Sequence, residues 1–137
     1  TIKKAAEKSI YLHEKLDAAL GSHHNVGEIR HIGLINAIEL VEDKESKRPF
    51  NAEKRIGWHI FRKAMDLGLV LRPIGDILYF NPPLTIEKET MDEAVRRCAE
   101  AVHAVLGDDK PSVLRLSGLY VGFNFIVRLT GLRFIEF

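Results

Sequence analysis

The stretch RKAMDLGLVLRPIGDILYFNPPLTI, residues 62–86, carries the clearest structural signals in this sequence. Its first residues continue a helical pattern that should end at Gly68. Two short apolar runs follow, Leu69–Arg72 and Asp76–Phe80, each with the composition of a strand. Because the tripeptide Pro-Ile-Gly between them favours a tight reversal, the stretch predicts a helix followed by a β-hairpin.

Three residues of this stretch have further expected positions. Arg72 should be the last residue of the first strand, which would give its guanidinium a rigid mount. Pro82 and Pro83 should end the second strand, because neither residue can donate a hydrogen bond to a neighbouring strand.

Helices are predicted on both sides of this hairpin. Residues 2–20 place apolar side chains at helical spacing, and Gly21 should end that helix in a left-handed conformation. Asn51 should cap a second helix, and a third should run from Lys88 to Leu106 and end at Gly107. The apolar side chains expected on the buried faces include Leu12, Leu16, Leu20, Ile56, Ile60, Ala64, Leu67, Met91, Val95, Cys98 and Val102, with Trp58, Phe61 and Met65 widening the second stripe.

Residues 26–41 change to a period of two, which is typical of a strand. One face would carry Ile32, Leu34, Ile38 and Leu40, and the other Ile35, Ala37 and Val41. The pattern predicts one long strand that is buried on much of both faces. The charged segment 42–50 should be an exposed connection.

The resulting order is helix-strand-helix-strand-strand-helix, which predicts an α+β (α/β) fold. We expect a small, mostly antiparallel sheet of about three strands with three helices packed on it, formed by residues 1–107. Residues 108–137 form an atypical apolar tail, whose longest uncharged run, 116–127, is too short to span a bilayer as a helix. Its alternation favours a strand that could pair with the sheet or with a second copy.

Composition excludes several function classes. The chain has 137 residues, of which 46% are hydrophobic, as in an ordinary single domain. Twenty Lys and Arg residues against 19 Asp and Glu leave no strong field for nucleic acid or an anionic membrane. One cysteine and no signal-peptide pattern near the first residue favour a cytoplasmic protein.

The histidines and the cysteine give little support for metal or nucleophilic chemistry. No two histidines have the helical spacing of a zinc site with a nearby glutamate, and no metal site is expected. His23 and His24 should be solvated in a polar loop. Cys98 lies on the apolar stripe of the third helix, which favours a buried, inert thiol.

Arginine remains as the candidate binding group. A guanidinium can form two parallel hydrogen bonds to a carboxylate, and Arg72 is placed beside a rigid turn. By its residues alone, Arg72 is more simply an edge-strand arginine that is solvated or paired with a local acid. The same interpretation holds for Arg30, and Glu39 should pair with a nearby basic group.

Three segments together resemble the C-terminal small domain of class III aminotransferases, which are pyridoxal-phosphate enzymes of fold type I. They are VGEIRHIGLINAIELVE from Val26, the stretch 62–86, and the helix from Lys88. The sequence of these segments most resembles the branch of the family that converts 8-amino-7-oxononanoate to 7,8-diaminopelargonate in biotin synthesis, with S-adenosylmethionine or lysine as amino donor. The resemblance extends from Thr1 to about Gly107.

The resemblance implies a role for Arg72, since the arginine of the family's RPxGD string receives the carboxylate of the amino- or keto-acid substrate. It also implies that Pro73, Gly75 and Asp76 shape the turn beside that site, and that Pro82 and Pro83 fix the chain that leaves it. No catalytic residue is expected in this chain.

The same resemblance places pyridoxal phosphate in a large domain that precedes the matching region, in an enzyme expected to be a homodimer. None of the ten lysines lies in the motif of the cofactor-binding lysine. We therefore expect this chain alone to bind no cofactor and to transfer no amino group. The alternative is a free-standing, non-catalytic α+β module for binding or oligomerisation.

Overall fold

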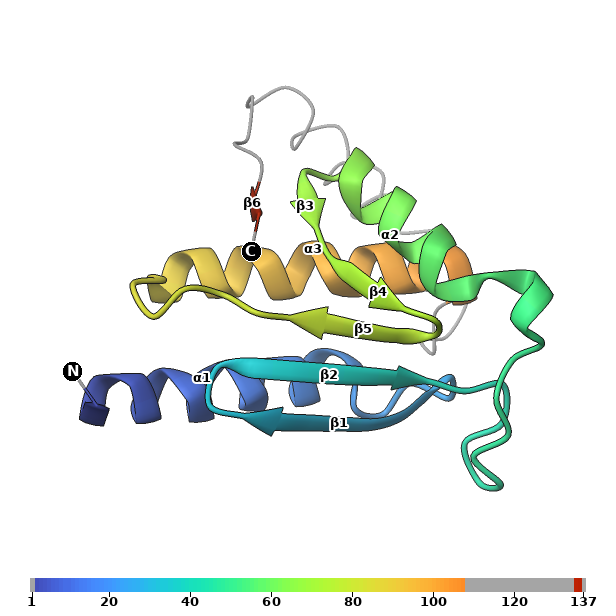
Figure 1. The fold of residues 1–137 in the computed structure, drawn as a ribbon, viewed down its shortest axis with the longest axis horizontal. Coiled ribbons are helices and arrows are strands. Elements are labelled where there is room, and N and C mark those ends of the chain that lie inside the picture. Colours follow the sequence, from blue (N-terminus) through green and yellow to red (C-terminus); the bar gives the residue numbers. More distant parts are fainter. Residues whose placement is uncertain (1, 108–134, 137) are drawn as a thin grey trace, which may run out of the picture.

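The computed structural model describes residues 2–107 and 135–136. The fold has three α-helices, α1 (Ile2–Leu20), α2 (Ile56–Asp66) and α3 (Lys88–Leu106), and a four-stranded antiparallel sheet. The sheet has the strand order β1-β2-β5-β4, with β1 at Val26–Ile32, β2 at Ile35–Leu40, β4 at Arg72–Ile74 and β5 at Ile77–Phe80. Helices α1 and α3 lie behind the sheet, and α2 lies beside it, next to β4 (Figure 1). The expected α+β class, the antiparallel sheet and the three helices are confirmed.

The prediction of one long strand over residues 26–41 is wrong. The chain reverses at Gly33 and Leu34, and β1 and β2 pair as a hairpin. Gly33 has a φ of +56°, which glycine adopts without the strain that a side chain would cause. Ser9 of α1 fixes this turn, because its hydroxyl donates to the Gly33 carbonyl at 2.5 Å. Ile32, expected to be buried, is 85% exposed beside the turn.

The core lies between the sheet and the helices. On β2 and β5 alternate side chains point to α1 and α3, among them Ile38, Leu78 and Phe80, all fully buried. They pack with the predicted apolar stripes of the helices, including Leu16 and Met91. Since this packing covers one face of the sheet, the other face is left without a helix in the described part of the chain.

The bounds of α1 and α3 are those that the apolar periodicity predicts. Gly107 follows α3 with a φ of +89°, as expected, but Gly21 is not left-handed. The Gly21 N–H instead continues the helical pattern by donating to the Asp17 carbonyl at 2.8 Å. The charged connection 42–50 is largely exposed, as predicted.

Asn51 is an N-cap, but not of the predicted helix. Its side chain accepts from the Glu53 N–H at the start of a short 3₁₀ helix, η1 (Ala52–Lys54). The α-helix α2 begins only at Ile56, after Arg55 in a left-handed conformation. The helical stripe is therefore correct for Ile60 and Ala64, whereas Trp58 is 39% exposed and lies outside it.

His23 is the clearest error in the prediction of solvated loop histidines. It is 2% exposed and connects the end of α1 to the end of α3, since Nε2 lies 2.8 Å from the Gly107 carbonyl oxygen. Its Nδ1 accepts from the Asn25 N–H at 3.0 Å, so Nε2 carries the proton. His24 is exposed, as expected. Burial of an imidazole in a polar loop depends on where α3 ends, which local sequence does not show.

The run Leu69–Arg72 does not form one strand. Leu69–Val70 is β3, which leaves the main sheet and pairs in parallel with β6 (Ile135–Glu136). The buried Arg97 of α3 holds the start of β3 by donating to the carbonyl of the preceding residue, Gly68, at 3.0 Å. The expected strand behaviour of residues 116–127 lies outside the described residues.

Candidate functional site

Arg72 lies on the uncovered face of the sheet. It is exposed and pairs across the edge of the sheet with Tyr79 of β5. The prediction that it ends a strand is wrong, because Arg72 is the first residue of β4, and Pro73 and Ile74 belong to the strand as well. The turn itself consists only of the next two residues, Gly75 and Asp76.

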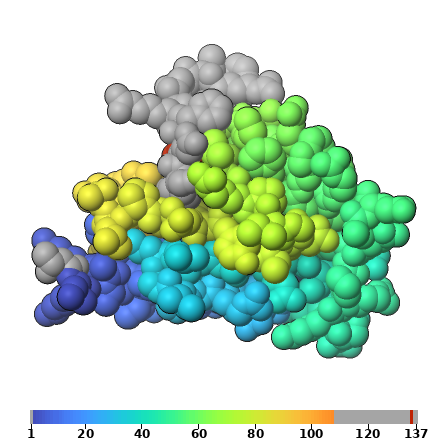
Figure 2. Space-filling model, in the orientation of Figure 1, coloured from blue at the N-terminus to red at the C-terminus, as the bar shows by residue number. Residues whose placement is uncertain are grey.

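The strand register places Arg72 in a row with residues of the other three strands. Tyr79 pairs with Ala37 of β2, and Ala37 pairs with Arg30 of β1. Residues paired in this way share a face of the sheet, so the two arginines flank a tyrosine and an alanine. Figure 2 looks onto this uncovered face, where no helix covers the strands.

Isoleucines lie on both sides of this row of residues, and on one side the carboxylates of Glu39 and Glu28 continue the line of Ile74 and Ile77. Ile74 and Ile77 pair with each other beside Arg72 and Tyr79, and Ile32 pairs with Ile35 on its other side. Ile74 is 68% exposed and Ile35 is 46% exposed. An exposed apolar surface beside a guanidinium suits a ligand or a protein segment that carries both an acid and hydrocarbon.

Arg30 has its charge satisfied locally. Its guanidinium donates to Glu39 at 2.9 Å and to Glu28 at 3.2 Å. The hydrogen bond to Glu39 is the main cause that raises the pKa of Arg30 above its ordinary value. The expectations that Arg30 has a local acid and that Glu39 has a basic partner are both confirmed.

The turn next to Arg72 is held by two other elements. The Asp76 carboxylate accepts from the Gly57 N–H of α2 at 3.1 Å, and the Asp76 carbonyl accepts from the Leu40 N–H at 2.9 Å. Gly75 has a φ of +59°. A Cβ atom on Gly57 would lie closer than 3.0 Å to the Gly75 carbonyl oxygen, so α2 can approach the turn only through a glycine.

Sequence reasoning missed Gly57. A glycine in the first turn of a helix is a weak signal by itself, because nothing near it in the sequence shows what it packs against. The expected end of the second strand is correct, since β5 stops at Phe80 before Pro82 and Pro83. The Pro83 carbonyl accepts from the Ile86 N–H at 3.0 Å and forms a turn that leads into α3.

The remaining candidate groups are structural. Cys98 is buried, and burial raises the pKa of its thiol to about 12, which fits the predicted inert role. Among residues 2–107 and 135–136, no three His, Cys, Asp or Glu side chains are arranged to hold a metal ion.

Pyridoxal phosphate needs a lysine that can bind it covalently and an acid that faces its ring nitrogen. From residue 2 to residue 107, every lysine is exposed or half-buried, and none lies in an enclosed site. The residues described here therefore do not fit a site for this cofactor, and we derive no chemical step through it.

Comparisons with known proteins show the family of this chain. A family model described as aminotransferase class-III matches residues 1–102. This chain belongs to the class III aminotransferase family. The adenosylmethionine-8-amino-7-oxononanoate aminotransferase of Geobacter sulfurreducens is 38% identical over 104 residues, which are 76% of this chain and 23% of that protein.

Other members of the family are equally similar. The diaminobutyrate–2-oxoglutarate transaminase of Halomonas elongata is 39% identical over 103 residues, which cover 74% of this chain and 22% of that enzyme. The crystal structure of adenosylmethionine-8-amino-7-oxononanoate aminotransferase from Methanocaldococcus jannaschii matches with a TM-score of 0.71 and 28% identity, over 77% of this chain and 24% of that one. The class III chain described here thus spans about a quarter of the length of these relatives.

Class III aminotransferases are pyridoxal-phosphate enzymes. Their printed names cover several transaminations, and the family alone does not select one. None of the helices in the described residues is long and apolar enough to cross a membrane.

Proposed function

We propose that residues 1–107 are the C-terminal small domain of a class III aminotransferase and that Arg72 binds the carboxylate of its amino- or keto-acid substrate. The finer proposal is the conversion of 8-amino-7-oxononanoate to 7,8-diaminopelargonate. Both the similar protein of Geobacter sulfurreducens and the similar structure from Methanocaldococcus jannaschii are named adenosylmethionine-8-amino-7-oxononanoate aminotransferase.

The observation that carries the proposal is the position of Arg72 on a hairpin held at its turn. A guanidinium fixed on a strand binds a carboxylate at little cost in side-chain order. Tyr79, Ile74 and Ile77 lie beside it on the same face, and they offer an apolar surface to an aliphatic substrate chain. The long hydrocarbon chain of an oxononanoate suits such a surface.

The uncovered sheet face supports a second part of the proposal. A domain that spans a quarter of its relatives leaves most of the enzyme to other polypeptide, and we propose that the large domain packs against this face and supplies pyridoxal phosphate. Homodimer formation and a cytoplasmic location belong to the same proposal, since we expect both for the class III aminotransferase that this chain resembles.

The test is Arg72→Ala in the complete enzyme that carries this domain. Loss of a charged, paired hydrogen bond should raise the KM for the carboxylate-bearing substrate about 10- to 100-fold. The KM for a neutral amine should not change. Arg48→Ala is the matched control, because Arg48 is exposed and pairs with Glu42 in the charged connection. An unchanged KM for the acid in Arg72→Ala would remove Arg72 from the site.

A further inference from the structure

The hairpin that carries Arg72 has little support of its own. β4 is an edge strand of three residues, and it pairs only with β5 in the described part of the chain. Pro73, its middle residue, has no N–H, so the strand has at most two backbone donors. Arg72 thus depends on contacts elsewhere for a fixed position.

Those contacts come from the first turn of α2. The residue before this helix, Arg55, provides no side-chain cap, and the Gly57 N–H is satisfied by the Asp76 carboxylate at 3.1 Å, from 19 residues further along the chain. The Asp76 carbonyl also accepts from the Leu40 N–H of β2. Asp76 therefore ties the turn to a helix on one side and to a central strand on the other.

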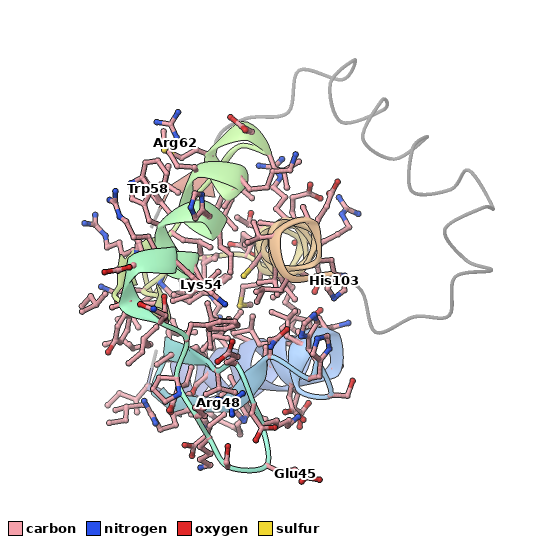
Figure 3. All side chains as sticks on the ribbon, turned by 90° about the vertical axis from the view of Figure 1, so that its right-hand side faces the viewer. Glu45, Arg48, Lys54, Trp58, Arg62 and His103 are labelled. Carbon is pink, nitrogen blue, oxygen red and sulfur yellow. The ribbon has the colours of Figure 1, made fainter. Side chains whose placement is uncertain are left out.

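The close approach adds a steric component. With a hydrogen in place of a side chain, Gly57 allows the Gly75 carbonyl to lie against the helix. Trp58, the next residue, points outward from α2 and is covered by Arg55 and Arg62, whose guanidinium carbons lie 4.7 and 5.6 Å from its ring centroid. Figure 3 shows Trp58 and Arg62 on the side of α2 that faces away from α3. Trp58 therefore points away from the turn, and Gly57 is the residue of α2 that contacts it.

We propose that Asp76 and Gly57 are positioning residues for Arg72: their contact fixes the tilt of the β4–β5 hairpin and so the place where the guanidinium meets a carboxylate. This inference rests on the proposed function of Arg72. It assigns to Asp76 a role through α2, and it requires no contact of Asp76 with substrate.

The experiment compares Asp76→Ala, Asp76→Asn and Arg72→Ala in the complete enzyme. Asp76→Ala removes the acceptor for the Gly57 N–H and should raise the KM for the carboxylate-bearing substrate about tenfold. The kcat, and the KM for a neutral amine, should stay within about twofold, because the reacting atoms are untouched. Asp76→Asn keeps an oxygen acceptor and should restore most of the KM.

Asp66→Ala is the control, since Asp66 is an exposed aspartate at the other end of α2. Far-UV circular dichroism verifies that each variant of the complete enzyme is folded. If Asp76→Ala does not fold, the KM of Asp76→Asn against that of Asp76→Leu at reduced temperature provides the same comparison.

The outcomes separate the two proposals. If Arg72→Ala raises the KM but Asp76→Ala does not, or if Asp76→Ala lowers kcat equally for acid and amine substrates, the positioning role is wrong and the binding role of Arg72 stands. If Arg72→Ala itself has no effect on the KM, both proposals fail.

Discussion

Replacing Gly57 with alanine sets two effects of opposite sign against each other. In an ordinary helix the change from glycine to alanine stabilises the folded state by up to about 1 kcal/mol, because glycine loses more backbone freedom on folding. At Gly57 the new methyl group would lie 3.2 Å from the Gly75 carbonyl carbon, 3.4 Å from the Asp76 Cα and closer still to the Gly75 oxygen.

The neighbouring atoms are backbone, and they cannot move aside as the end of a side chain would. Overpacking of this kind costs about 1 to 3 kcal/mol. We take the upper value, because the hydrogen bonds of Asp76 to Gly57 and Leu40 hold the turn in place. Separation of α2 from the turn would also weaken the hydrogen bond between Gly57 and Asp76, which has the size of a helix cap, about 1 kcal/mol. We expect a net loss of about 3 kcal/mol in the free energy of unfolding.

Thermal unfolding followed by circular dichroism measures this loss in the 137-residue chain. A loss of this size should lower the Tm by roughly 12 °C or more in a domain of about 100 residues. Urea unfolding should show a lower midpoint with an unchanged slope. Asp66→Ala on the same helix should leave the Tm unchanged or slightly higher. A Gly57→Ala variant at least as stable as the original chain would refute the close approach of α2 to the turn.

Two further predictions concern titratable groups away from this turn. Cys98 should react with a thiol reagent at pH 8 at a small fraction of the rate of a free thiol, because its buried thiol has a pKa of about 12. It should react fully in urea, where the chain is unfolded. Fast reaction of the folded chain would contradict the burial of Cys98. The Tyr11 hydroxyl donates to the Asp92 carboxylate at 2.6 Å, and this bond is the main cause that raises the pKa of Tyr11 above 10.0. The stabilisation from this hydrogen bond is complete below the pKa of Tyr11 in the unfolded chain and is lost as the pH rises through its pKa in the folded chain. Asp92→Asn should therefore lower the pKa of Tyr11, measured by absorbance at 295 nm, and weaken the pH dependence of stability in this alkaline range. An unchanged pKa of Tyr11 in Asp92→Asn would exclude the hydrogen bond between Tyr11 and Asp92.

The sequence by itself determined the helices and the class of the fold. The stripes of α1 and α3 lie within single segments, so the apolar period of each one shows its bounds without knowledge of its neighbours. The reversal between β4 and β5 is local as well, because glycine takes up a positive φ at its own position, as Gly75 does. The family resemblance likewise rests on short strings that can be read along the chain.

Only the tertiary structure decided the hairpin of β1 and β2 and the surroundings of Arg72. A turn of two residues leaves the alternation of Leu34, Asn36, Ile38 and Leu40 unbroken, so a period of two cannot distinguish one long strand from two paired strands. The row from Arg72 to Arg30 follows from strand register, and the contact of Asp76 with Gly57 joins residues 19 positions apart. Such contacts depend on how whole elements pack, and no period within one segment records which partner a residue meets.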